Sequence, residues 1–163
     1  MLVFRNYIMI EINTKIIINS DIKKVWNFIS AIQRDPSFWK GMTRVRNKSR
    51  EGNMIIREIT FTNSEKCYQK LFLFPMEGIH TRWTSGFLRG IKDIMITAMG
   101  NQTLVEIEMR YTLHGITQIR SKSIAEELRN EAKLALQLIK EDIEKIQPFP
   151  LDKRTHWADM LHE

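Results

Sequence analysis

Arg57 and Tyr111 are the polar residues of this sequence that are best placed to do chemistry inside the protein. Each lies in a segment where polar and apolar residues alternate, a pattern that buries one face of a strand. A buried guanidinium without a partner is very costly. An inward Arg57 therefore predicts an internal carboxylate such as Asp93, or an anionic group of a ligand, beside it. In the opposite register of the same strand Arg57 is solvated, and the sequence leaves both registers open.

The sequence contains no signature of a metal site, an activated nucleophile or a phosphate-binding loop. Cys67 has no partner thiol, and Gly86 and Gly90 are not followed by the Lys-Ser/Thr pair of a phosphate loop. There is no Gly-x-Ser-x-Gly elbow, and the histidines lack the spacing of zinc ligands: His80, His114, His156 and His162. We therefore expect no metal and no cofactor, and neither a nucleotide hydrolase nor a metalloenzyme.

A run of basic residues at alternate positions predicts a positive stripe on one face of a strand. Its members are Arg44, Arg46, Lys48 and Arg50, and Arg34 and Lys40 could extend it. Such a stripe could bind a phosphate-rich partner, or it could protect an edge strand from pairing with other chains. We favour edge protection over nucleic-acid binding, because nucleic-acid recognition also needs exposed aromatic residues or a base-reading helix, and the sequence indicates neither.

Length and composition predict one domain in a reducing compartment. The chain has 163 residues, and its 25 Lys and Arg against 19 acidic residues give a net charge of +6, a weak pointer to anionic partners. Cys67 is expected to be a small buried hydrophobe, so no disulfide holds the fold and we expect a cytoplasmic protein. No stretch approaches the ~20 consecutive apolar residues of a membrane span. Nothing in the sequence indicates an oligomeric state.

The order of hydrophobic patterns predicts a sheet followed by a helix. Period-two alternation from Tyr7 to Ile18 predicts a first strand, and apolar spacing of three and four after Asp21 predicts a short helix. Pro36 interrupts this pattern, which resumes briefly at Phe38. Six further strands then follow one another, approximately at residues 43–50, 54–62, 65–74, 78–84, 91–99 and 105–113.

A long amphipathic helix is predicted from Ser123 to Ile146, with prolines 148 and 150 after it. Its apolar face carries Ile124, Leu128, Ala132, Ala135, Ile139, Ile143 and Ile146, with Leu136 and Leu138 at the flanks. A single helix that follows a meander of strands favours an α+β domain in which helix and sheet enclose an apolar interior. We expect this domain to span residues 1–146 and a C-terminal tail to span residues 147–163.

The order of these elements resembles the helix-grip superfamily of START-like, birch-pollen-allergen-like and polyketide cyclase/dehydrase-like proteins. Residues 21–30 look like that family's helix opening, Pro36-Ser37-Phe38-Trp39 is similar to its second short helix, and residues 100–105 look like the turn into its last strand. The resemblance covers residues 8 to 146. It implies a curved seven-stranded antiparallel sheet around the last helix, with a cavity reached near two short helices between the first and second strands. It implies no catalytic motif.

These patterns predict a cavity for a hydrophobic or amphipathic small molecule, such as a lipid or a polyketide. We expect it to be lined by Arg57, Ile59, Phe61, Trp83, Met95, Val105, Ile107, Met109, Tyr111, Leu128, Ala132 and Ala135. Ordinary core packing is the alternative for each of these residues. The alternative functions are a cyclase/dehydrase-type enzyme, in which Arg57 and Tyr111 orient an enolisable substrate, and an interaction module that uses the basic strand.

Overall fold

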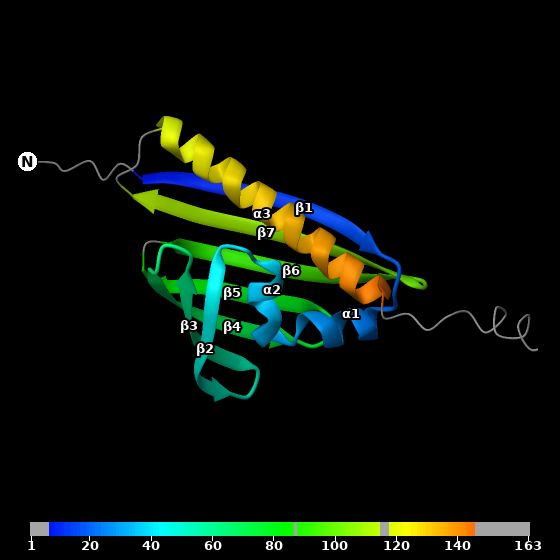
Figure 1. The fold of residues 1–163 in the computed structure, drawn as a ribbon. Coiled ribbons are helices and arrows are strands. Elements are labelled where there is room, and N and C mark those ends of the chain that lie inside the picture. Colours follow the sequence, from blue (N-terminus) through cyan, green and yellow to red (C-terminus); the bar gives the residue numbers. More distant parts are fainter. Residues whose placement is uncertain (1–6, 87, 115–117, 146–163) are drawn as a thin grey trace, which may run out of the picture.

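The computed structural model describes residues 7–86, 88–114 and 118–145, which form a curved sheet around one long helix (Figure 1). In these residues seven antiparallel strands lie in the spatial order β1-β7-β6-β5-β4-β3-β2. The strands are β1 (Tyr7–Ile18), β2 (Met42–Glu51), β3 (Met54–Phe61), β4 (Lys66–Phe74), β5 (Gly78–Ser85), β6 (Arg89–Met99) and β7 (Gln102–His114). The helices are α1 (Ile22–Ile29), the 3-10 turn η1 (Ile32–Arg34), α2 (Asp35–Phe38) and α3 (Gln118–Lys145). The predicted helix-grip α+β architecture is confirmed.

Alternating side chains give each strand one buried face, as the sequence pattern predicts. On β7 the residues Val105, Ile107, Met109, Tyr111 and Leu113 are all buried, whereas the residues between them are half-buried or exposed. The last strand pairs with the first along its length, so that residue 12 lies opposite residue 109. This pairing places the start of α3 beside the first strand.

Helix α3 lies along β1 and β7 on the concave face of the sheet (Figure 1). It begins at Gln118, five residues before the predicted start at Ser123. The first turn carries few residues that pack inward, and Ile119 is 85% exposed, so hydrophobic periodicity could not indicate it. The predicted end at Ile146 and the predicted tail at 147–163 lie outside the described residues.

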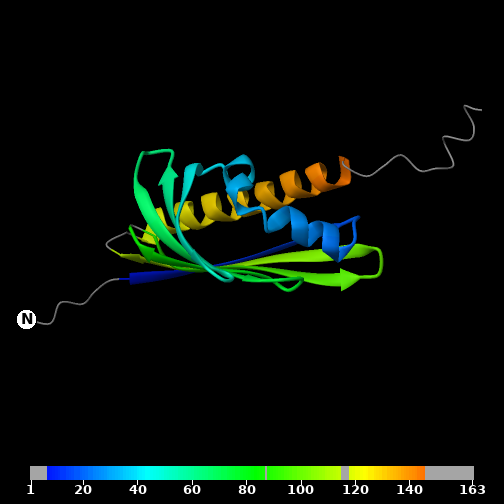
Figure 2. The ribbon, with the colours of Figure 1, turned by 90° about the horizontal axis from the view of Figure 1, so that it is seen from below.

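The connection between β1 and β2 forms the two predicted short helices. The Asp21 carboxylate caps α1 by accepting a hydrogen bond from the backbone N–H of Lys24 at 3.0 Å. Pro36 lies in the first turn of α2, where its missing N–H leaves no helical hydrogen bond unmade. Helices α1 and α2 lie on the same face of the sheet as α3 (Figure 2). None of the helices described is both long and apolar enough to cross a membrane.

Candidate functional site

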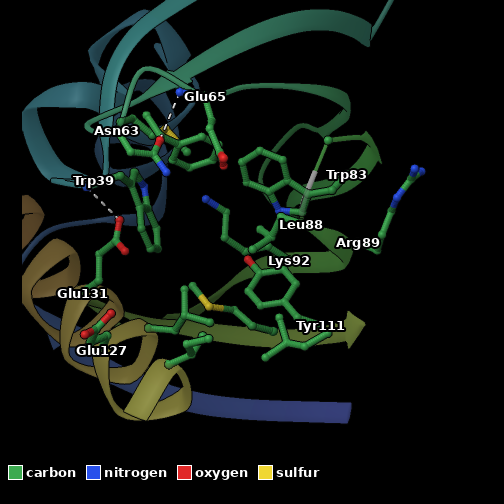
Figure 3. A pocket seen from close by; sticks show the side chains of 18 of the residues that line it. Trp39, Asn63, Glu65, Trp83, Leu88, Arg89, Lys92, Tyr111, Glu127 and Glu131 are labelled. Atoms are coloured by element: carbon green, nitrogen blue, oxygen red, sulfur yellow. Dashed lines mark hydrogen bonds between the residues drawn. The ribbon is translucent and has the colours of Figure 1, made fainter. Parts of the chain in front are cut away.

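A cavity of about 790 Å³ lies between the N-terminal half of α3 and the strands β3, β5, β6 and β7 (Figure 3). Its floor consists of buried apolar side chains: Trp39, Met42, Trp83, Leu88, Met109 and Leu113. Its rim consists of exposed polar and charged side chains: Asn63, Glu65, Arg89, Arg120 and Glu127. An apolar interior with a polar opening is the usual composition of a site for a small molecule.

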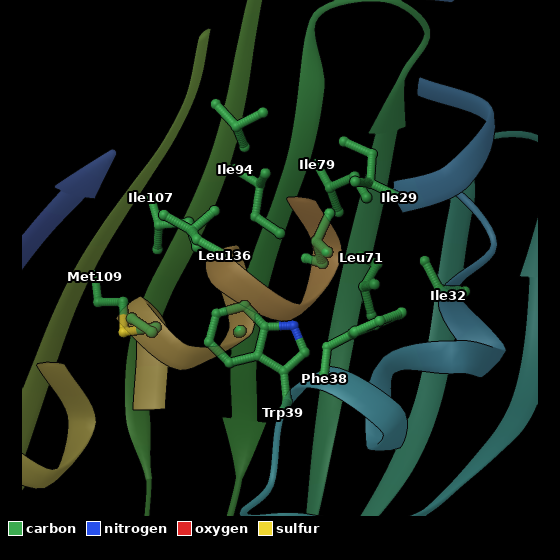
Figure 4. Packing of buried hydrophobic residues seen from close by; sticks show 14 of the residues in the cluster. Ile29, Ile32, Phe38, Trp39, Leu71, Ile79, Ile94, Ile107, Met109 and Leu136 are labelled. Atoms are coloured by element: carbon green, nitrogen blue, oxygen red, sulfur yellow. The ribbon is translucent and has the colours of Figure 1, made fainter. Parts of the chain in front are cut away.

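Side chains pack against one another along the C-terminal half of α3. Towards the C-terminal half of α3, Leu136 packs among aliphatic side chains from the strands, such as Ile94 and Ile107, with Ile29 of α1 and Phe38 of α2 nearby (Figure 4). Ala132 and Ala135 are fully buried in this half of the helix and do not line the cavity. Their small side chains therefore allow the helix to approach the sheet closely. The cavity therefore lies beside the N-terminal half of α3, whereas buried side chains pack around its C-terminal half.

Gly90 separates two aromatic residues at the cavity. In the sheet it lies between Trp83 of β5 and Tyr111 of β7, which are its partners in register on either side. Its φ of +134° is unfavourable for residues with a side chain, and an added Cβ would lie 2.0 Å from the backbone oxygen of Arg110. The absence of a side chain at Gly90 therefore allows the backbones of β6 and β7 to approach closely beside the two aromatic residues.

Lys92 brings a buried positive charge to the cavity. Its side chain is 3% exposed, and its Nζ atom lies 3.7 Å from the centre of the Trp39 ring. It forms no hydrogen bond or ion pair with any residue that the structure describes. A desolvated cation–π contact contributes about 2 kcal/mol, whereas removing an ion from water costs several kcal/mol. The contact with Trp39 therefore offsets only part of the cost of burying this charge.

Burial accordingly lowers the pKa of Lys92 to about 8. The Asp35 carboxylate of α2 opposes this lowering, the Arg57 guanidinium of β3 adds to it, and the Glu131 carboxylate of α3 opposes it. Both carboxylates already accept other hydrogen bonds. Asp35 Oδ2 accepts one from Arg57 Nη2 at 2.6 Å, and Glu131 Oε1 accepts one from the backbone N–H of Gly41 at 3.1 Å.

Trp83 and Tyr111 place two further hydrogen-bond donors at the same end of the cavity as Lys92. The Trp83 side chain is 5% exposed, and its Nε1–H has no hydrogen-bond partner among the described residues. Burial raises the pKa of the Tyr111 phenol, the neighbouring Trp83 side chain opposes this rise, and the Glu131 carboxylate adds to it. Tyr111 is therefore protonated at neutral pH and can donate. We call Trp83, Lys92 and Tyr111 the donor cluster; their side chains extend into the same space (Figure 3).

Arg57 points inward, as one of the two predicted registers requires, but it does not line the cavity. Its Nε donates to Gln69 Oε1 at 2.8 Å, its Nη1 donates to the backbone oxygen of Ile32 at 3.1 Å, and its Nη2 pairs with Asp35. The prediction that Asp93 pairs with Arg57 was wrong, because the Asp93 carboxylate pairs with His80 elsewhere in the sheet. Arg57 thus fastens η1 and α2 to the sheet, and the pair of Arg57 and Tyr111 suggested for catalysis is not formed at the cavity.

Five of the predicted cavity residues line the cavity: Phe61, Trp83, Met109, Tyr111 and Leu128. Ile59, Val105 and Ile107 are buried in the core, as are the two alanines of α3. Met95 lies on the opposite face of β6 and is 38% exposed, because the inward positions of that strand are 92, 94 and 96. Lys92 was not predicted, although a lysine at an inward position of an alternating strand is the signal that could have identified it.

The opening of the cavity differs from the one that the family resemblance implies. No residue of α1, η1 or α2 lines the cavity, and Trp39, the C-cap residue that follows α2, is the nearest contribution. Most of the rim comes from the turn after β3, the start of β6 and the first turns of α3. The opening therefore lies between the β3–β4 turn and the N-terminal half of α3.

The basic strand β2 lies at the edge of the sheet, as edge protection requires. Lys48 Nζ lies 3.8 Å from a carboxylate oxygen of Glu58 on β3. The prediction of one continuous stripe was wrong, because the register shifts between Asn47 and Ser49. Arg46 lies opposite Glu58, whereas Arg50 lies opposite the buried Ile55, so the shift moves Arg50 to the other face of the strand.

No group of His, Cys, Asp and Glu side chains within the described ranges could hold a metal ion. No protein-family model matches the sequence, and no curated protein matches it either. Solved structures do match the fold. The aromatase/cyclase Zhui from Streptomyces sp. R1128 is 8% identical, with a TM-score of 0.71, over 85% of this chain and 95% of that one.

Two further solved structures agree with this fold. A START superfamily protein from Mycobacterium smegmatis is 11% identical over 85% of this chain and 99% of that one, with a TM-score of 0.67. Norcoclaurine synthase from Thalictrum flavum, in complex with dopamine and hydroxybenzaldehyde, is 14% identical over 91% of this chain and 98% of that one, with a TM-score of 0.63. The chain therefore shares the helix-grip fold of these structures, a curved antiparallel sheet around one long helix.

Proposed function

We propose that this protein binds a hydrophobic or amphipathic small molecule, such as a lipid or a polyketide, in the cavity beneath the N-terminal half of α3. The observation that carries this proposal is the hollow of about 790 Å³ in an otherwise well-packed interior. A hollow of this size leaves apolar side chains in contact with water, and a ligand that covers them would remove that apolar surface from water. The fold shared with ligand-binding and cyclase proteins supports the same function.

Titration with the uncharged fluorescent probe N-phenyl-1-naphthylamine tests this proposal. Leu128 on α3 lines the cavity, whereas Leu134 on the same helix is 44% exposed and does not. We expect the probe to bind the wild type with a stoichiometry of one. The Leu128→Trp variant, which places a larger side chain in the cavity, should bind it at least about tenfold more weakly, and the matched control Leu134→Trp should bind it normally. Equal binding by both variants, or no binding by the wild type, would refute the proposal.

Native mass spectrometry against a panel of fatty acids and aromatic polyketides identifies the ligand class. Members of the panel that occupy the cavity should displace the probe and raise the melting temperature, since a ligand that binds only the folded state stabilises it. If no compound displaces the probe and none raises the melting temperature, this result would count against a role in binding lipids or polyketides.

A cyclase or dehydrase activity is the second candidate function. It is favoured by Lys92, whose pKa of about 8 allows it to gain or lose a proton near neutral pH inside the cavity. Mass spectrometry after chromatographic separation distinguishes the two functions. A carrier returns the bound compound unchanged, a dehydrase returns a product that has lost water, and a cyclase that does not dehydrate returns an isomer of the same mass with a different retention time.

A further inference from the structure

We propose that the ligand carries an anionic oxygen group, such as a carboxylate or an ionised phenol or enol, and that this group binds against the donor cluster. The apolar body of the ligand then lies along the floor formed by Met109, Leu113 and Leu128. This inference rests on the proposed function and names the chemical class of the ligand at the same site.

The first argument comes from the partners of the buried cation. Lys92 lies against the face of Trp39, and within the described chain no carboxylate forms an ion pair with it. The carboxylates that influence it, Asp35 and Glu131, are held by the guanidinium of Arg57 and the backbone of Gly41. An anion that enters the cavity would therefore supply the partner that the folded chain does not supply.

The second argument comes from the polarity of the whole cluster. The Nε1–H of Trp83 is a donor that cannot accept, and among the described residues it is buried at the cavity without a hydrogen bond of full geometry, although it interacts with the Tyr111 hydroxyl. The Tyr111 phenol is buried at the same end of the cavity and remains protonated. Three groups that can all donate select for a ligand group that accepts, and they disfavour an ammonium group, which has only donors. A charge-assisted hydrogen bond is also the strongest kind that such donors can form.

The third argument comes from the rim. Its charged residues, Glu65, Arg89, Arg120 and Glu127, are exposed and of both signs. Screening by water and salt weakens the electrostatic interaction of such exposed groups with a charged ligand. Of the charged residues that line the cavity, Lys92 is buried, Glu131 is half-buried with one oxygen accepting from the backbone of Gly41, and the others are exposed. Discrimination by charge is therefore expected inside the cavity, where Lys92 is the cation, and not at its opening.

The test compares two probes with the same aromatic skeleton. 8-Anilino-1-naphthalenesulfonate carries a sulfonate group, and N-phenyl-1-naphthylamine lacks it. We expect the wild type to bind the sulfonate probe more tightly. The Lys92→Met variant should bind that probe about 10- to 100-fold more weakly and the uncharged probe within about twofold of the wild type. The control Lys133→Met, which removes an exposed lysine of α3, should change neither affinity.

Two further variants sharpen the result. Trp83→Phe keeps an aromatic ring and removes the N–H, so we expect a severalfold lower affinity for the sulfonate probe and no change for the uncharged probe. Arg89→Met removes an exposed charge at the rim and should have little effect. The inference is wrong if Arg89→Met weakens binding of the sulfonate probe as much as Lys92→Met does. It is also wrong if Lys92→Met binds both probes with the affinity of the wild type. In either case the proposed function still stands. If the wild type binds neither probe, the proposed function itself fails.

Discussion

Replacing Lys92 with methionine should stabilise the ligand-free protein at neutral pH, and this gain should shrink as the pH rises. Burial lowers the pKa of Lys92 from 10.5 to about 8. At about 1.4 kcal/mol for each pKa unit, the charged form costs the folded state about 3 kcal/mol. Methionine has a similar length, carries no charge and packs well against the Trp39 ring, so it removes this cost.

The sign of the pH dependence follows from the lowered pKa. Below about pH 8 lysine 92 is protonated in both the folded and the unfolded chain, so the full cost is present. Between about pH 8 and 10.5 the unfolded chain binds more protons than the folded one, so the stability of the wild type rises with pH relative to the variant. The advantage of Lys92→Met should therefore be about 3 kcal/mol at pH 7 and should narrow by about 2 kcal/mol by pH 10.

Urea unfolding at pH 7 and pH 10, followed by circular dichroism, measures this difference. The other ionisable groups are the same in the wild type and the variant, so their contributions cancel in the comparison. Lys133→Met, which removes an exposed lysine of α3, serves as the control. A pH-independent difference for Lys92→Met would show that the lysine is not buried as a charge, and the reasoning about the donor cluster would fail with it.

Three other substitutions test the packing around the cavity. Arg57→Met should lower the free energy of unfolding by about 3–5 kcal/mol, because it leaves three buried or half-buried acceptors unpaired; a urea midpoint near that of the wild type would contradict this. Gly90→Ala should cost more than about 1 kcal/mol in thermal unfolding, because its Cβ would lie 2.0 Å from a backbone oxygen, whereas Gly52→Ala, where nothing lies within 4 Å, should cost less. Leu136→Ala should cost about 2–5 kcal/mol in urea yet leave the affinity for N-phenyl-1-naphthylamine within about twofold, and a large loss of affinity would mean that the solid end of the interior also holds ligand.

The fold could be predicted from the sequence because most strands alternate between apolar and polar residues and most turns carry glycine, asparagine or proline. The exceptions have local causes. The first turn of α3 presents no apolar stripe, so periodicity places the start of the helix too late. The bulge in β2 is a one-residue irregularity that has no signature in a run of basic residues, so the side of the strand to which Arg50 belongs could not be predicted.

The candidate site could be predicted only in part, because it depends on contacts between distant segments. Alternation identified Trp83 and Tyr111 as inward residues, and both line the cavity. The same rule applied to β6 would have identified Lys92 and excluded Met95. The pairing of Arg57 with Asp35 joins a strand to a short helix 22 residues earlier, and no local pattern specifies which carboxylate reaches it.

The indole N–H resonances of the tryptophans give the most direct test of the hollow interior. Trp83 and Trp39 line the cavity, whereas Trp26 is buried in α1 away from it. In a ¹H–¹⁵N spectrum of the protein titrated with N-phenyl-1-naphthylamine, we expect the Trp83 resonance, assigned with the Trp83→Phe variant, to shift strongly while that of Trp26 stays in place. A saturating titration that leaves the Trp83 resonance unmoved, or that moves Trp26 instead, would contradict a ligand cavity at this end of α3.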